Sequence, residues 1–293
     1  MKKIILVTGG AGFIGTNLIK RLIHTENYEI ISVDNYSTGS KKNHINNKNI
    51  KYINSDTKNI SKILKAYKKK IYCIFHFGEF ARIHQSFYLT DDCFKSNVTG
   101  TFEVFKFSRL NKIRIIYSAT SASLGNNGKD ADLSPYAFTK AKNIELLNNL
   151  KKWFNYKSDI IYFYNVYGPN QIKDGFMSTV IGIFERQYVK KVPLTVVSPG
   201  TQKRKFTHID DTIDACIYVL KKKKYMQFSV SFKRSYSVHE VAKFFKSKIK
   251  LIPSRKGERI KSSIVKKIRG YKIMNIEARH DIKDYISKFI NKS

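Results

Sequence analysis

Tyr136 and Lys140 are the residues whose types and spacing in this 293-residue chain most readily support chemistry. They lie four residues apart at the expected start of a helix, so both side chains project from one helix face. A nearby ammonium lowers the pKa of a phenol, so Tyr136 can accept a proton from a hydroxyl while hydride leaves the same carbon. Lys140 can also hold a nicotinamide ribose. The alternative is an exposed Tyr–Lys pair without function, which chance produces easily in a chain with 18 tyrosines.

Hydroxyl side chains end the strand-like run that comes just before this helix. Residues 115–125 read Ile-Ile-Tyr-Ser-Ala-Thr-Ser-Ala-Ser-Leu-Gly, with Thr120 and Ser121 near the polar end. At the carboxyl edge of a parallel sheet, Thr120 or Ser121 can hydrogen-bond a reacting oxygen beside Tyr136 and hold it in line. Strand, hydroxyl and Tyr–Lys helix in this order favour a catalytic site over an ordinary polar junction.

A glycine-rich loop near the start of the chain predicts a dinucleotide site. Gly9, Gly12 and Gly15 lie between a short apolar run and an amphipathic segment, which gives the order strand, loop, helix. Such glycines let the backbone approach a pyrophosphate, and the free N–H groups of the helix start bind the anion. Asp34 ends the next strand-like run, where a carboxylate accepts hydrogen bonds from the adenosine ribose and repels a 2′-phosphate. The sequence therefore favours NAD over NADP.

Strand-like apolar runs alternate with longer amphipathic stretches through the first half. This pattern predicts an α/β fold of the Rossmann type, a doubly wound parallel sheet with its ligand crevice at the carboxyl edge. After residue 169 the pattern loosens, and we expect only helices over 176–189 and 210–224 and a strand over 194–197. We predict an NAD-binding domain over 1–165 and a smaller substrate-binding lobe over 166–293. The expected strands of the first half are 4–8, 29–34, 51–53, 71–77, 113–118 and 160–164.

The formal net charge of +33 is the most unusual feature of the composition. It raises the possibility of a polyanion partner, because clustered cations neutralise phosphates. Arginine is the minority among the 55 basic residues, and the lysines are scattered along the chain. We therefore expect solvated lysine faces and no specific nucleic-acid partner.

No run approaches the roughly 20 apolar residues of a membrane span. The chain begins with a short strand-like run, so we expect neither a signal peptide nor a membrane anchor. The cysteines, at positions 73, 93 and 216, are widely spaced among apolar neighbours and predict reduced packing residues, without a disulfide or a metal site. These features favour a cytoplasmic protein.

Through its glycine loop and its Ser/Thr, Tyr and Lys residues, the sequence resembles the extended short-chain dehydrogenase/reductase family. Within that family it resembles the nucleotide-sugar 4-epimerases and 4,6-dehydratases. The resemblance spans nearly the whole chain. It implies NAD as the cofactor, a nucleotide sugar (UDP-linked) as the substrate, and a homodimer. Gly9, Gly12 and Gly15 match the family's glycine signature, and Thr120, Tyr136 and Lys140 match its catalytic triad.

The resemblance also assigns residues to the cofactor and to the substrate. Around the cofactor it implies Phe13 and Ile14 after the phosphate loop, Asp34 and Asn35 at a ribose, Asp56 and Thr57 near adenine, Phe77, Gly78 and Glu79 along the cleft, and Asn97, Ser118 and Tyr164. Toward the substrate it implies Thr120 and Ser121 at the sugar, Asn165 at the diphosphate, and the diphosphate-binding arginines Arg204 and Arg255.

Departures from the family pattern bear on the reaction. Family dehydratases carry Asp-Glu after the catalytic Thr, an acid and a base for removing water, whereas this chain has Ser121-Ala122. This favours a 4-epimerase that acts through a transient 4-keto sugar. A 4,6-dehydratase, a 4-dehydrogenase or reductase, and a basic non-catalytic binding protein stay open as alternatives. Leu124 replaces a usual Tyr, and Lys205 stands where an Asp is common, so we expect both to alter the sugar pocket.

Ser262 is the expected gate for the sugar's C2 substituent. In related epimerases the gate lies five positions after the glycine that follows the diphosphate-binding arginine, and counting from Gly257 gives Ser262. A serine leaves room for an N-acetyl group, so UDP-N-acetylhexosamines are expected to enter as well as UDP-hexoses. The alternative is a surface serine in a lysine-rich segment.

Overall fold

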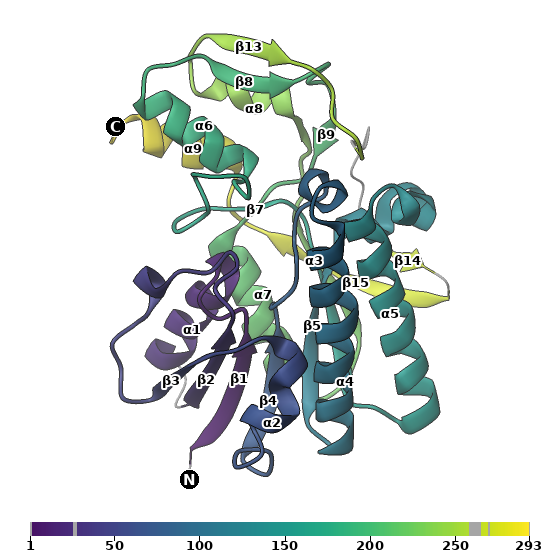
Figure 1. Cartoon of the computed structure of the whole chain (residues 1–293). Coiled ribbons are helices and arrows are strands. Elements are labelled where there is room, and N and C mark those ends of the chain that lie inside the picture. Colours follow the sequence, from purple (N-terminus) through teal and green to yellow (C-terminus); the bar gives the residue numbers. More distant parts are fainter. Residues whose placement is uncertain (1, 26–27, 258–264, 269, 293) are drawn as a thin grey trace.

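A nine-stranded sheet in the order β14-β15-β11-β6-β5-β4-β1-β2-β3 forms the centre of the molecule (Figure 1). The computed structural model describes residues 2–25, 28–257, 265–268 and 270–292. All strand pairs in the sheet are parallel except β14–β15. The strands are β1 (Lys3–Thr8), β2 (Tyr28–Asp34), β3 (Ile50–Asn54), β4 (Ile71–His76), β5 (Arg114–Thr120), β6 (Ser158–Phe163), β11 (Gln227–Phe232), β14 (Lys267–Ile268) and β15 (Tyr271–Ala278).

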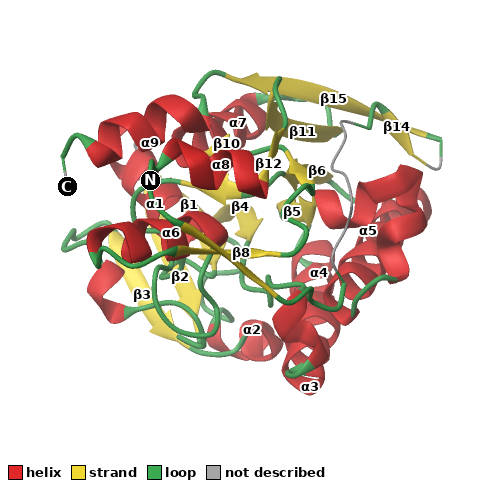
Figure 2. Ribbon diagram, turned by 90° about the horizontal axis from the view of Figure 1, so that it is seen from above, coloured by secondary structure: helices red, strands yellow, loops and turns green. Residues whose placement is uncertain are grey.

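Helices cover both faces of the sheet, as Figure 2 shows. The alternation of side chains along each strand divides the core in two. Leu6 of β1 packs in the cluster that contains Phe105 of α4, whereas its neighbour Val7 packs with Leu18 of α1. One face carries α2 (Ile60–Ile63), α4 (Thr101–Leu110) and α5 (Pro135–Phe154), with α3 (Thr90–Phe94) beside them, and the other carries α1 (Phe13–Thr25) and α7 (Ile209–Lys221).

A smaller lobe lies over the carboxyl edge of the sheet (Figure 1). Its own apolar core includes Phe184, Val241 and Ile286, from three different helices. The lobe contains α6 (Val180–Val189), α8 (Val238–Phe244), α9 (Ile282–Ile290), the parallel pair β8 (Leu194–Val197) and β13 (Ile249–Ile252), and the short strands β7 (Val166–Tyr167), β9 (Lys203–Arg204), β10 (Thr207–His208) and β12 (Tyr236–Ser237).

The sequence prediction of the fold class is confirmed, and the strands expected in the first half are present within two residues of the expected bounds. The segment 166–293 supplies the lobe and also β11, β15 and α7, which extend the sheet and cover it. The chain thus returns to the sheet twice after residue 165, and the division at that residue stays a prediction.

The helix expected over 176–189 begins later, at Val180. Thr179 caps it, because its hydroxyl oxygen accepts a hydrogen bond from the Gly182 amide at 3.0 Å. The preceding residues form a turn, in which the Ser178 amide donates to the Gly175 carbonyl. Among the described helices, none is both long and apolar enough to cross a membrane.

A buried ion pair fastens the amino-terminal edge of the sheet. Arg114 opens β5 and donates from Nε and Nη2 to the Asp159 carboxylate in β6, at 2.9 and 2.8 Å. The same guanidinium donates to the carbonyls of Val219 and Leu220 in α7, and the second carboxylate oxygen accepts from the Met226 amide. One pair thereby joins two strands, a helix end and the entry to β11.

We expect Asp159→Asn to destabilise the fold by about 3 kcal/mol or more, because it leaves the buried Arg114 cation without its counterion. The side chains of Asp159 and Arg114 are 0% and 9% exposed. Urea unfolding measures the change. Glu103→Gln, which breaks the surface pair with Lys106, is the control and should change the free energy of unfolding by less than about 1 kcal/mol. Equal effects of the two substitutions would contradict the role of burial.

Candidate active site

A cleft of about 490 Å³ runs along the carboxyl edge of the sheet, and residues of both the sheet and the lobe line it. This is within the usual range for a site that encloses a small ligand. Its two ends differ in chemistry, because the glycine loop lines one end and Arg204 and Arg255 line the other. The sequence-predicted residues that line it are Gly9, Gly12, Phe13, Ile14, Gly15, Asp34, Asn35, Asp56, Thr57, Phe77, Gly78, Glu79, Ser118, Thr120, Ser121, Tyr136, Lys140, Asn165, Arg204 and Arg255.

The glycine loop fits a pyrophosphate. A Cβ on Gly15 would lie 2.2 Å from the carbonyl oxygen of Gly9, so only glycine permits the close packing of α1 on the loop. A Cβ on Gly12 would meet only the Gly9 oxygen, at 3.3 Å, and would otherwise occupy open space in the cleft. Because α1 begins at Phe13, the N–H groups of its first turn lie beside this space.

Asp34 lies where an adenosine ribose would be held. Its carboxylate accepts hydrogen bonds from the amides of Ala11 and Tyr36, at 2.9 and 2.8 Å, which fix it between the glycine loop and the loop after β2. Each oxygen keeps a lone pair for a ribose hydroxyl. Burial raises the pKa of Asp34, and the two amide donors oppose that shift.

The start of α5 brings Tyr136 and Lys140 to the middle of the cleft. Ser134 caps the helix by accepting from the Ala137 amide at 3.1 Å, and Pro135 occupies the first turn. The Tyr136 amide donates to Ser86 Oγ at 3.2 Å, which ties the helix start to the loop after β4. Both side chains are largely buried, at 8% and 4% exposure, so they face the cleft and not bulk solvent.

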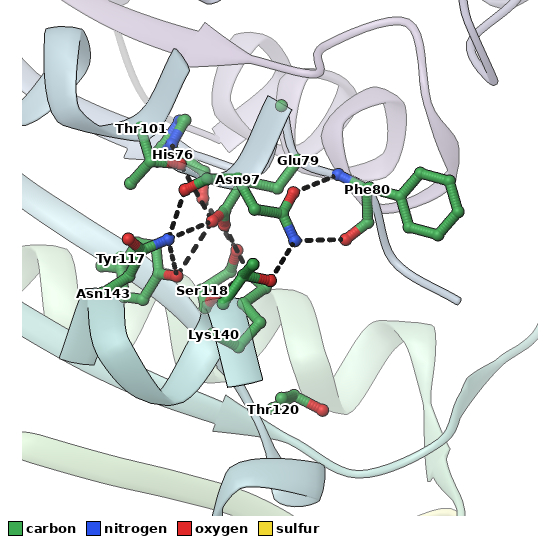
Figure 3. Close-up of polar contacts among 12 residues, drawn as sticks. His76, Glu79, Phe80, Asn97, Thr101, Tyr117, Ser118, Thr120, Lys140 and Asn143 are labelled. Carbon is green, nitrogen blue, oxygen red and sulfur yellow. Dashed lines mark hydrogen bonds and ion pairs between the residues drawn. The ribbon is translucent and has the colours of Figure 1, made fainter. Parts of the chain in front are cut away.

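Lys140 is held by two acceptors (Figure 3). Its Nζ forms a short ion pair with the Glu79 carboxylate and donates to the Ser118 carbonyl at 2.6 Å. The ammonium also lies 4.8 Å from the centroid of the Tyr117 ring. An ammonium has three protons, so one remains for a ligand in the cleft.

Thr120 stands apart from this network in Figure 3. Its Oγ1 accepts from the Ala122 amide at 3.1 Å and so begins the run of 3₁₀ turns over Ser121–Asp132. A hydroxyl that accepts in this way still has its hydrogen to donate. Thr120 can therefore orient an oxygen that Tyr136 approaches.

Two sequence-predicted cofactor residues do not line the cleft. Tyr164 is fully buried in the core on the α5 side, because side chains alternate along this segment and its neighbour Phe163 takes the cleft position. Asn97 is also fully buried. It accepts from the Phe80 amide at 2.7 Å and donates to the Phe80 carbonyl, so it contacts the cleft wall from behind.

Lys205 also departs from expectation. We expected this residue to alter the sugar pocket, but its side chain is 6% exposed and its Nζ donates to the carbonyls of Phe232 and Lys233, at 2.9 and 2.6 Å. Burial lowers its pKa. The ammonium thus binds the backbone carbonyls at the end of β11, and Lys205 does not line the cleft. Ser262 lies outside the described residues.

Arg82 is a cleft residue that the sequence did not reveal. Its Nε donates to the Met177 carbonyl and its Nη1 to the Ala81 carbonyl, both at 2.8 Å, and these bonds hold the guanidinium at the cleft wall. Burial lowers the pKa of Arg82, and the neighbouring Tyr136, when ionised, opposes that shift. A single arginine in an irregular segment carries no periodic signal, so only the structure could identify it.

The described residues also bring His208, Asp210 and His280 together outside the cleft, with potential ligand atoms within 4.8 Å of one another. His280 Nδ1 already lies 3.0 Å from the Asp211 carboxylate, and Arg279 lies beside the same carboxylate. A resident cation there would face the Arg279 guanidinium, so we assign no metal to this group.

Comparison with known proteins gives a family match over most of the chain. The sequence model of the NAD dependent epimerase/dehydratase family matches residues 5–231. The ADP-L-glycero-D-manno-heptose-6-epimerase of Brachyspira hyodysenteriae is 31% identical over 71% of this chain and 69% of its own length. UDP-glucuronic acid decarboxylase 6 of Arabidopsis thaliana is 27% identical over 84% of this chain and 74% of its own.

Solved structures share the fold. A UDP-glucose 4-epimerase of Thermotoga maritima, solved with UDP-glucose, has a TM-score of 0.86 at 23% identity and covers 98% of this chain and 97% of its own. A UDP-glucuronic acid 4-epimerase of Bacillus cereus, solved with UDP-glucuronic acid and NAD, has a TM-score of 0.84 at 23% identity and covers 99% of both chains.

Substitutions in the glycine loop test the cofactor end. Gly12→Ala should weaken NAD binding about tenfold or more, because its methyl group occupies the space of the pyrophosphate, while the unfolding temperature stays close to that of the native protein. Gly15→Ala is the matched control and should itself destabilise the fold by about 1–3 kcal/mol, because its methyl group collides with the Gly9 carbonyl. Calorimetric titration with NAD and thermal unfolding measure the two effects. Unchanged NAD affinity in a folded Gly12→Ala protein would refute the assignment.

Proposed function

Because the chain belongs to the NAD dependent epimerase/dehydratase family, we propose that it is a nucleotide-sugar 4-epimerase that acts on a UDP-hexose or UDP-N-acetylhexosamine. The observation that carries the proposal is the position of Thr120, Tyr136 and Lys140. They line the middle of one cleft, between the glycine loop and the two arginines. The family's cofactor is NAD, and the glycine loop with Asp34 fits its adenosine and pyrophosphate.

Tyr136 is the base of the proposed reaction. It accepts the proton of the sugar's C4 hydroxyl, Thr120 donates a hydrogen bond to the same oxygen, and the Lys140 ammonium stabilises the phenolate before the proton arrives. When bound, NAD would supply the hydride acceptor of the first half-reaction and, in its reduced form, the hydride donor of the second. After the 4-keto sugar has rotated to present its other face and hydride has returned to C4, Tyr136 returns the proton to the same C4 oxygen.

The far end of the cleft holds the nucleotide diphosphate in this proposal. Arg204 and Arg255 can each form paired hydrogen bonds with phosphate oxygens. The Asn165 side chain donates to the Lys205 carbonyl at 2.9 Å. This bond ties the chain just after β6 to the residue that follows Arg204. This anchoring lets the sugar turn over while the nucleotide stays in place.

The acids of the cleft favour an epimerase over a 4,6-dehydratase. The carboxylates among the described lining residues are Asp34, Asp56 and Glu79. Asp34 lies at the adenosine end, Asp56 caps the turn after β3, and Glu79 is engaged by Lys140. Ser121 and Ala122, which replace the dehydratase acid and base, line the cleft without a carboxyl group. A dehydratase reaction would therefore lack a proton donor for the departing hydroxyl.

A panel of UDP-sugars tests the reaction class. We expect an epimer of unchanged mass, without net NADH and without loss of water, and a deuterium at C4 of the substrate should be retained in the product. Net NADH would indicate a 4-dehydrogenase, and loss of water a dehydratase. Turnover of no nucleotide sugar at all would favour a non-catalytic binding protein.

Tyr136→Phe should lower turnover by about a hundredfold or more, because it removes the proton acceptor and keeps the ring. Equilibrium dialysis with the UDP-sugar should show nearly unchanged binding. Tyr162→Phe is a matched control, since this buried tyrosine donates its hydroxyl to Gln227 Oε1 within the sheet at 2.9 Å and does not line the cleft. Equal losses in the two variants would place the base elsewhere.

We further infer that two copies of the chain form a homodimer through α3, α4 and α5. Phe94, Val98 and Phe102 recur every four residues at 38%, 41% and 48% exposure, and Phe138 of α5 stacks on Phe94. A cluster of exposed apolar side chains of this kind marks an interaction surface. Sedimentation equilibrium should give a dimer, and Phe102→Lys should shift it toward the monomer. A monomeric native protein would contradict the inference.

We also place the protein in the cytoplasm. The chain's cysteines, Cys73, Cys93 and Cys216, are buried free thiols whose pKa is raised by burial. Unpaired cysteines that pack as small apolar residues are typical of a reducing compartment.

A further inference from the structure

Glu79 is a buried carboxylate at the floor of the cleft, and neighbouring groups donate to both of its oxygens (Figure 3). One oxygen accepts from Thr101 Oγ1 and Tyr117 OH, each at 2.9 Å, and from Asn143 Nδ2 at 3.1 Å. The other oxygen is the partner of the Lys140 ammonium. The Glu79 side chain is 1% exposed and that of Lys140 is 5% exposed, so the pair is almost wholly withdrawn from water.

A directed chain of hydrogen bonds ends on this carboxylate. Thr101 has a single hydroxyl proton, which it gives to Glu79, so it must accept from His76 Nε2 at 3.0 Å. Burial lowers the pKa of His76 to about 4, so the ring is neutral at pH 7, and its Nδ1 accepts from Thr8 Oγ1 at 2.6 Å. Thr8 in turn accepts from the Gly78 amide at 3.1 Å. Every donor in the chain points toward Glu79 and favours its ionised form.

We propose that Glu79 is a positioning residue, which fixes the Lys140 ammonium beneath the cleft and balances its charge, and so acts on proton transfer at Tyr136 through Lys140. The inference rests on the proposed function. Three neutral donors hold the carboxylate, the carboxylate holds the ammonium, and Lys140 lies one helical turn from Tyr136. Glu79 and the Ser118 carbonyl thus fix the position of the Lys140 ammonium, and its third proton is left for the cleft.

Stability alone does not account for this pair. Desolvating two charges usually offsets their attraction, so a buried ion pair contributes little to the free energy of folding compared with apolar packing. The Arg114–Asp159 pair at the opposite edge of the sheet fastens four elements. The Lys140 ammonium instead bonds Glu79 and the Ser118 carbonyl, directly beneath the cleft, where an ordered cation has a chemical use.

The charge balance sets the direction of the expected effect. In the native protein the carboxylate partly cancels the effect of the ammonium on Tyr136. Glu79→Gln leaves the ammonium uncancelled, so it favours the phenolate form of Tyr136, while the charged form of Lys140 loses its counterion. Within the part of the chain that the structure describes, the other titratable or charged groups that face these three are His76, Arg82, Cys93 and Tyr117.

The pH profile of kcat/KM is the first test. In Glu79→Gln both limbs should move to lower pH, by about one unit, and kcat at the optimum should fall about tenfold or more with a smaller change in KM. Asp159→Asn is the matched control, because it also removes a buried carboxylate from a cation but lies at the opposite edge of the sheet. It should lower stability and leave both limbs in place. A Glu79→Gln profile with native limbs would overturn the proposal.

Titration of Tyr136 itself is the second test, and it needs no sugar substrate. Subtracting the phenolate absorbance of Tyr136→Phe from that of the native protein gives the titration of Tyr136. The same difference between Glu79→Gln and Glu79→Gln/Tyr136→Phe should show this titration at lower pH. Glu79→Gln/Lys140→Met removes both charges, so it preserves the fold and should return the titration to the native pH or above. An unmoved titration refutes the role of Glu79. A moved titration without turnover of any nucleotide sugar refutes the proposed function and leaves the role of Glu79 intact.

Discussion

The parallel direction of the main strands is the constraint on which the rest of the structure depends. Eight strands from β3 to β15 run in the same direction, so all of them end at the same edge of the sheet. The loops that follow them at this edge cannot pair their backbone groups with the sheet. The first turn of α1, the Asp34 carboxylate and the start of α5 all lie at that edge for this reason. The lobe then covers the edge, and the cleft is what remains between them.

Sequence could predict most strands of the first half because β1, β2, β4, β5 and β6 are largely buried and read as apolar runs. β3 is an edge strand with no fully buried residue, and its run was the shortest of those expected. β11 is also buried but reads Gln-Phe-Ser-Val-Ser-Phe, since the hydroxyls of Ser229 and Ser231 donate to Asn275 of β15, at 3.0 and 3.4 Å. Polar groups that satisfy each other across two strands cannot be identified from one strand. Two-residue strands such as β9 and β12 carry still less signal.

The residues of the candidate site also fall into two groups, those that the sequence could predict and those that it could not. Gly12, Tyr136 and Lys140 could be predicted because the geometry they need is local, a loop before a helix or two positions on one helix face. Glu79 could be assigned to the cleft by resemblance, but its side-chain partners come from three other elements, α4, β5 and α5. Tyr164 was assigned to the cofactor by its place in a motif, but side chains alternate along this segment and that of Tyr164 lies in the core. Contacts between distant segments are set by packing, which no spacing in the sequence encodes.

Charged side chains are distributed unevenly along the cleft. Asp34 and Asp56 line the adenosine end, whereas Arg82, Arg204 and Arg255 line the part that includes Tyr136 and the lobe. Glu79 balances Lys140, so it does not offset the arginines. In the proposed function, this charge distribution attracts the anionic diphosphate of the substrate to the lobe side of the cleft and matches the neutral ribose of the cofactor to the acidic side. On that proposal the two ends of the cleft accept different parts of the ligands, and the reacting carbon of the sugar is placed beside Tyr136 between them.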